Sequence, residues 1–256
     1  FVRGHAYGEL EKYQEAIKDY DKAIELNPNN ASYYNNRGIA YSNLEDYEKA
    51  IQDYNRAIEL EPNDASTYFN RGIAFANLNN YDKAIENLNK TIELNPNDDS
   101  AYFNRGTAFI NLSDYEKAIQ DYNKAIELEP NDASYYNNRG SLYINQRNYN
   151  EAIKDFSKAI ELNPIFAFGY SNLGNLYNNL NDYEKAIEIL NKAIELDPNF
   201  SDACNVIEII STTQNNKKVI KFGKNGSKQN IKESKEPIYS IIFNQINSLY
   251  ITGNFK

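Results

Sequence analysis

A proline recurs every 34 residues, and this period is the strongest constraint on how the 256-residue chain can fold. The members of the series are Pro28, Pro62, Pro96, Pro130, Pro164 and Pro198. Three more series keep the same step: glycines from Gly4 to Gly174, alanines from Ala16 to Ala186, and tyrosines from Tyr13 to Tyr183. Four series in phase over six periods indicate an internal repeat. A period of this length is typical of stacked helical hairpins.

Residues 31–64 illustrate how one repeat is expected to form two helices. Asn30 is placed to cap the first helix, and later repeats carry Asp64, Asp98 and Asp132 at the same position. The first helix should close near Leu44, with a turn at Glu45–Asp46. Pro62 should end the second helix, because proline lacks the backbone donor and disfavours a helical residue before it. Later breaks are expected near Asn79, Pro96 and Ser113, with no strand within residues 1–213.

The glycine and alanine series predict close helix crossings. A glycine inside a helix costs roughly 1 kcal/mol relative to alanine, so six in one phase imply a packing reason. Gly38 and Ala50 are therefore expected where two helices cross, because a larger side chain would separate the helix axes.

These features resemble the tetratricopeptide repeat family. The matching residues in one repeat are Tyr34, Gly38, Tyr41, Ala50, Tyr54, Ala57 and Pro62. The resemblance implies an all-α fold, a right-handed α-solenoid whose first helices line a concave face, and a role in binding other proteins. A single hairpin cannot bury its apolar face alone, so the array is expected to fold by stacking.

The expected domain organisation follows the repeat and the composition. Residues 1–199 should form six repeats, the first one truncated, with the array continuing upstream of Phe1. Residues 200–213 should form a capping helix, because Glu208 stands where the repeat glycine would fall. Residues 214–237 are expected to be a basic flexible linker. The alternative is an electrostatic contact with an acidic partner or nucleic acid.

Residues 238–256 change period and are expected to be extended. The triplets Ile241–Phe243 and Leu249–Ile251 favour strands around an Asn-rich turn. This segment resembles the opening hairpin of a WD-repeat β-propeller blade, which implies that a propeller follows. The Gly-His pair usual before the first strand is missing.

Composition argues against several other functions. The formal net charge of −9 disfavours nucleic acid as the main partner, because a phosphate backbone needs a basic surface. One histidine, His5, and one cysteine, Cys204, cannot make a Cys/His zinc site or a convincing catalytic triad. No apolar run is long enough to span a bilayer. We therefore expect a cytoplasmic protein that is not an enzyme, with no cofactor, metal, small-molecule substrate or membrane contact.

An asparagine lies two residues before each repeat glycine from the second repeat onward. The members of this asparagine series are Asn36, Asn70, Asn104, Asn138 and Asn172. A carboxamide offers a donor and an acceptor together, which matches a peptide group. In arrays resembling O-GlcNAc transferase and kinesin light chain, this asparagine holds the backbone of an extended peptide. The alternative is that these residues only reflect the abundance of asparagine in the chain.

Apolar residues stand beside this series in the middle repeats. Phe69, Ile73, Phe103 and Ile110 are candidate anchors for a bound peptide if they are exposed, or core residues if neighbouring repeats overlap tightly. The Lys/Arg clamp with which some tetratricopeptide co-chaperones hold heat-shock chaperone tails is not matched, because those positions hold Asn35, Ser66 and similar residues. A chaperone tail is therefore disfavoured as the partner.

These observations favour a scaffold that binds an extended peptide in the concave groove of the solenoid. Two other functions remain open from the sequence. The array could be a structural spacer that docks by its convex face in a large assembly, or a regulatory or targeting arm of an enzyme outside these residues.

Overall fold

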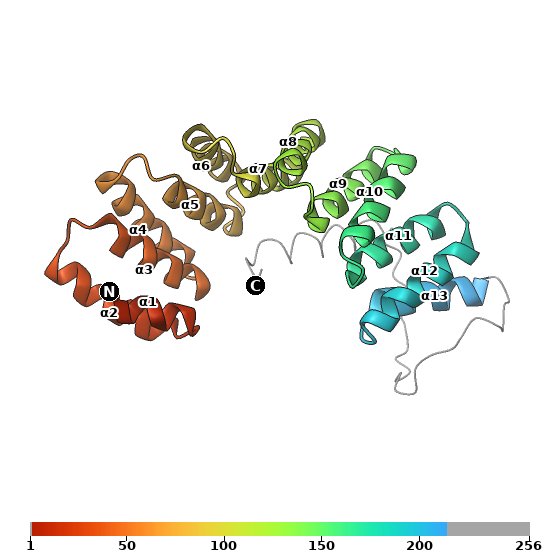
Figure 1. The fold of residues 1–256 in the computed structure, drawn as a ribbon, viewed down its shortest axis with the longest axis horizontal. Coiled ribbons are helices and arrows are strands. Elements are labelled where there is room, and N and C mark those ends of the chain that lie inside the picture. The colour runs from red at the N-terminus through yellow and green to blue at the C-terminus, as the bar shows by residue number, and fades with distance from the viewer. Residues whose placement is uncertain (1, 214–256) are drawn as a thin grey trace. The chain divides into compact units, whose positions relative to one another are not determined.

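The computed structural model describes residues 2–213, which form thirteen helices and no strand (Figure 1). The helices are α1 (Val2–Glu9), α2 (Tyr13–Leu26), α3 (Ala31–Asn43), α4 (Tyr47–Leu60), α5 (Ala65–Asn77), α6 (Tyr81–Leu94), α7 (Asp99–Asn111), α8 (Tyr115–Leu128), α9 (Ala133–Asn145), α10 (Tyr149–Leu162), α11 (Ala167–Asn179), α12 (Tyr183–Leu196) and α13 (Ser201–Thr213). The all-α array of tandem helical hairpins predicted from the period is confirmed.

Two compact units divide the described residues between Asp121 and Tyr122, inside α8. In the first unit, each second helix packs against its own first helix and against the first helix that follows, as α4 packs against α3 and α5. The first helices also touch in sequence, α3 with α5 and α5 with α7. The second unit repeats this arrangement, with α11 in contact with α9 and α13. Within each unit, the first helices therefore form a continuous layer.

The predicted turns between paired helices are confirmed and share one geometry. Glu45, Asn79 and Ser113 adopt positive φ angles of 61°, 57° and 61°. After α3, the Glu45 N–H donates to the Ser42 carbonyl at 3.0 Å, and the Asp46 N–H donates to the Tyr41 carbonyl at 3.0 Å. These two bonds satisfy carbonyls that a helix end would otherwise leave unpaired.

The aspartates at the predicted N-cap positions make cap hydrogen bonds, whereas Asn30 does not. The carboxylate of Asp64 accepts from the backbone N–H of Ser66 and Thr67, and Asp98 and Asp132 cap α7 and α9 in the same way. Asn30 stands at the N-cap position of α3 as predicted, but its side chain makes no cap hydrogen bond. Its Oδ1 is buried without a hydrogen-bond partner among the described residues.

The small residues lie at helix crossings, as predicted. Ala50 is fully buried, and a Cβ added to Gly38 would lie 2.6 Å from Cε1 of Tyr54. The same contact recurs in the second unit, where a Cβ on Gly174 would lie 2.6 Å from Cγ of Leu190. Each first helix therefore needs a glycine where the buried side chain of its second helix crosses.

Gly38→Ala should destabilise the protein, whereas Gly8→Ala should not. The alanine methyl at residue 38 must displace the buried Tyr54 ring, and such overpacking costs about 1–3 kcal/mol. Gly8 has open space around its Cβ position, so alanine should stabilise α1 by up to about 1 kcal/mol. Thermal unfolding of the two variants checks this. Equal shifts in Tm would contradict the packing role of Gly38.

The last described helix, α13, packs against α11 and α12 through one apolar face. Ala203, Val206, Ile207 and Ile210 are buried in a cluster with Leu190 of α12. Glu208, at the glycine position of the repeat, is exposed. These contacts support our proposal that α13 caps the array.

The expected linker at 214–237 and hairpin at 238–256 lie outside the described residues. Among residues 2–213, no helix combines the length and apolar character that crossing a membrane requires.

Candidate functional site

The asparagine series occupies the sixth position of five first helices and makes two kinds of hydrogen bond. Asn36, Asn104 and Asn138 donate through Nδ2 to a carbonyl of their own helix, four residues back, at 2.7–2.8 Å. Asn70 donates to Oδ1 of Asn35 in the preceding first helix at 3.2 Å, and Asn172 donates to Oδ1 of Asn137 at 2.8 Å. Two members of the series are therefore tied across a repeat boundary.

The residue 35 positions earlier decides between these two states. Asn70 and Asn172 each find an asparagine there, whose Oδ1 accepts a hydrogen bond. Asn104 finds Phe69, which offers no acceptor, so its amide turns back to the Ser100 carbonyl. The Asn104 carboxamide on α7 is therefore untied, by which we mean that it makes no hydrogen bond to the preceding first helix.

Asn36 and Asn104 keep the capacity to bind a peptide group. Both are half-buried, and each uses a single N–H of its carboxamide. Their Oδ1 atoms accept no hydrogen bond from the described residues. One N–H and the Oδ1 of each carboxamide therefore remain for a ligand. Asn70 is also half-buried, whereas Asn138 and Asn172 are buried.

The four apolar candidates differ in accessibility. Phe69 and Ile73, one turn apart on α5, are half-buried. Phe103 and Ile110 on α7 are only 6% and 7% exposed. Of the four candidates, Phe69 and Ile73 are therefore the more accessible to a ligand.

The first helices carry almost no negative charge. α3, α5, α9 and α11 contain no acidic residue, and α7 contains only Asp99. The acidic residues gather on the second helices and turns, as Glu48, Asp53 and Glu59 do on α4. The basic residues of α3, α5, α7 and α9 are one arginine in each helix, and other side chains of the array accept hydrogen bonds from all four. The rest of the surface around the asparagine series is polar and largely uncharged, which suits a peptide backbone better than a charged ligand.

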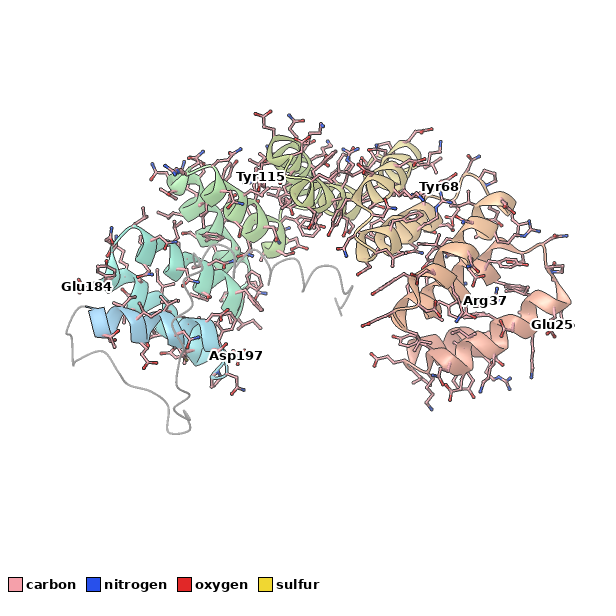
Figure 2. All side chains as sticks on the ribbon, turned by 180° about the vertical axis from the view of Figure 1, so that it is seen from behind. Glu25, Arg37, Tyr68, Tyr115, Glu184 and Asp197 are labelled. Carbon is pink, nitrogen blue, oxygen red and sulfur yellow. The ribbon has the colours of Figure 1, made fainter. Side chains whose placement is uncertain are left out.

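An arginine follows four of the five asparagines, and these arginines form a network that the sequence analysis did not predict. Arg37, labelled in Figure 2, lies on α3. It donates to both carboxylate oxygens of Asp53, at 2.6 and 2.8 Å, and to Asp21 at 2.6 Å. Both partners lie 16 residues away, one on each side. Arg105 and Arg139 repeat the arrangement, Arg105 with Asp121 and Asn89, and Arg139 with Asp155 and Asn123. Arg71 makes the same hydrogen bonds to two amide oxygens, those of Asn87 and Asn55, and therefore has no carboxylate partner among them. These arginines link consecutive hairpins and are engaged within the array.

Burial limits the net stabilisation from this network. Loss of solvent raises the pKa of the Asp53 carboxyl, an effect that outweighs its bond with Arg37. The hydrogen bond to Asp53 in turn raises the pKa of the Arg37 guanidinium. Replacing a buried ion pair with well-packed apolar side chains is often neutral or stabilising. The last repeat shows this exchange: Leu173 stands at the arginine position, is buried, and packs against Ile189 at the aspartate position.

Replacing Arg139 and Asp155 together by leucine and isoleucine should change the free energy of unfolding by less than about 2 kcal/mol. Asp155→Ile alone should cost about 3 kcal/mol, because it leaves the half-buried Arg139 without its carboxylate. A double-mutant cycle by denaturant unfolding measures the difference. Additive losses would show that the two side chains act independently.

The described residues contain no group of three or more His, Cys, Asp or Glu placed to hold a metal ion. The free Cys204 is half-buried on α13, and burial raises the pKa of its thiol. A raised pKa keeps the thiol protonated and unreactive near neutral pH.

Tandem hairpins with small residues at their crossings define an α-helical repeat protein. Tetratricopeptide repeat models match residues 31–64, 65–98, 100–132, 133–166 and 167–200, and a second tetratricopeptide model matches residues 4–45. These matches span more than half of the chain, so the protein belongs to the tetratricopeptide repeat family. The suggested WD-repeat segment lies outside the described residues and is not supported by these matches.

Solved structures of tetratricopeptide proteins share this fold. YrrB, described as a protein with an unusual peptide-binding site, is 27% identical with a TM-score of 0.60; the match covers 74% of this chain and 97% of YrrB. MamA from Desulfovibrio magneticus RS-1 is 25% identical with a TM-score of 0.61, over 66% of this chain and 96% of MamA. PilF of Pseudomonas aeruginosa, 17% identical with a TM-score of 0.69 over 80% and 93%, shares the fold alone. A comparison with curated protein sequences gives no match.

Proposed function

We propose that this chain is a protein-interaction scaffold that binds an extended peptide segment along its first helices. The untied carboxamides of Asn36 and Asn104 carry the proposal, because each presents a donor and an acceptor on a largely uncharged surface. The description of YrrB as a peptide-binding protein supports the same use of the fold.

Asn70, Asn138 and Asn172 belong to the proposed surface in a different role. Asn70 and Asn172 hold neighbouring first helices in register through Asn35 and Asn137, and a ligand would meet them through their remaining polar atoms. Phe69 and Ile73 would contact an apolar side chain of the ligand, and the more buried Phe103 and Ile110 would contribute less surface.

The expected ligand is a protein or peptide without a strong requirement for charge. Arg37, Arg105 and Arg139 are paired with aspartates, so they offer little to a terminal carboxylate. Arg71 donates to two amide oxygens and is the one arginine of these four that keeps an unbalanced charge. A heat-shock chaperone tail and nucleic acid are therefore poor candidates for this surface, since both need free basic groups.

The test is to select binders from a library of unstructured peptides and then locate the bound peptide by hydrogen exchange. Binding should slow the exchange of backbone amides in α3, α5 and α7. The exchange of backbone amides in α4 and α6 should stay unchanged. Protection confined to the second helices would instead favour a spacer that docks by its opposite face.

A further inference from the structure

The turn between α10 and α11 departs from the sequence shared by the other repeats. Four earlier boundaries read Pro-Asn, then Asn or Asp, then a small or acidic residue and serine, at 28–32, 62–66, 96–100 and 130–134. The fifth reads Pro164-Ile165-Phe166-Ala167-Phe168. Three polar positions have become large and apolar at a surface turn.

This substitution costs local stability. Phe166 caps α11 without a side-chain hydrogen bond, whereas Asp132 in the preceding repeat accepts one from the Ser134 N–H. Burial does not offset the loss, because Ile165 is 76% exposed and Phe168 is 39% exposed. Large apolar side chains that replace a capping residue and stay partly exposed are typical of a functional surface.

The three phenylalanines are packed together in a defined arrangement. The Phe168 ring lies 6.2 Å from Phe166 and meets Phe200 edge-on at 5.0 Å, which joins this turn to the turn between α12 and α13. Gly169 makes room for the arrangement, since a Cβ there would lie 3.0 Å from Cδ1 of Phe166 and 2.8 Å from Cγ2 of Ile160. We call Ile165, Phe166, Phe168 and Phe200 the aromatic edge.

Carboxylates flank the aromatic edge. Asp197, labelled in Figure 2, lies three residues before Phe200, and its carboxylate accepts a hydrogen bond from the Asn199 N–H at 2.9 Å. Asp202 lies two residues after Phe200, and neither aspartate forms an ion pair with the described residues. Glu161, four residues before Ile165, is paired with Lys158 at 2.7 Å. The edge is therefore apolar at its centre with free negative charge beside it.

We propose that the aromatic edge docks a segment of another protein in which lysine or arginine residues flank an aliphatic or aromatic side chain. The apolar side chain would cover Ile165 and Phe168, and the basic groups would approach Asp197 and Asp202. A second copy of this edge is a poor occupant, because it would bring the same carboxylates together. This surface lies at the turns, so the proposal is independent of peptide binding along the first helices.

The test is a titration of the full chain into a fluorescently labelled peptide, Lys-Lys-Leu-Phe-Lys-Lys, read by anisotropy. The matched variant is Ile165→Asn, Phe166→Asp and Phe168→Ser, which restores the turn sequence of residues 130–134. We expect this variant to bind at least tenfold more weakly while its Tm stays equal or rises, because a capping aspartate returns. A second variant, Asp197→Asn with Asp202→Asn, should bind several-fold more weakly at low salt and converge with the parent chain at high salt.

Each remaining outcome overturns the proposal. Equal affinity of the restored-turn variant would mean that the edge binds nothing of this kind. A markedly lower Tm would mean that the aromatic rings stabilise the turn, which contradicts the premise that this sequence costs stability. The chain itself carries Lys-Lys-Val-Ile-Lys-Phe at residues 217–222. If Lys217→Glu, Lys218→Glu and Lys221→Glu together made the probe bind more tightly, the occupant would be this segment and not another protein.

Discussion

Replacing Ala50 by aspartate should lower the free energy of unfolding by about 3–5 kcal/mol, the largest loss expected from a single substitution in the array. Ala50 is fully buried at the crossing of α3 and α4, beside the ring of Tyr54. A carboxylate at this position loses its water and finds no basic partner, because the surrounding cluster is apolar apart from tyrosine hydroxyls. Thermal or denaturant unfolding measures the loss.

Gln52→Asp is the matched control for Ala50→Asp. Gln52 is exposed two residues further along α4, so it receives the same new charge without burial. Its unfolding free energy should change by less than about 0.5 kcal/mol. If both variants melted with the parent chain, the assignment of the alanine series to helix crossings would be wrong.

Changing Asn36 and Asn104 together to alanine should weaken binding of a selected peptide about thirtyfold. Each lost hydrogen bond between a carboxamide and a neutral peptide group weakens binding by about 1 kcal/mol. A loss of about 1.4 kcal/mol in binding free energy raises the Kd tenfold. Stability should hold, because both side chains bond only to their own helices and alanine favours a helix. Isothermal calorimetry measures the affinity and circular dichroism the Tm.

Gln52 and Gln120 provide the control, since they are exposed carboxamides on second helices. Their replacement by alanine should leave the affinity unchanged. The opposite result, with loss of binding only in the Gln52 and Gln120 variant, would place the ligand on the other side of the array.

The repeat made most of this fold predictable, because its constraints are local or recur at a constant step. The positions of Gly38 and Ala50 specify a helix crossing, and Glu45, Asn79 and Ser113 mark turns that one left-handed residue closes. Asn30 shows where this reasoning stops. Asparagine is an ordinary cap residue, yet whether its oxygen meets the first-turn N–H groups depends on side-chain packing.

The candidate site was only partly predictable. The asparagine series can be found in the sequence from its constant spacing. The hydrogen bonds of Asn70 and Asn104 differ because the residues 35 positions earlier are Asn35 and Phe69. The arginine network has a sequence signal, a spacing of 16 on both sides of Arg37, that becomes meaningful once the hairpins are stacked. The aromatic edge is visible as a departure from the repeat, whereas its exposure comes from the structure.

Backbone methylation of the bound peptide tests the central claim most directly. If the first helices read peptide groups through Asn36 and Asn104, N-methylation of the peptide residues that face them should weaken binding by tenfold or more, because the methyl removes the N–H donor. Alanine substitution of the side chains at the same peptide positions should change the affinity less than threefold. A peptide that tolerates N-methylation throughout but loses its affinity on alanine substitution would contradict the account.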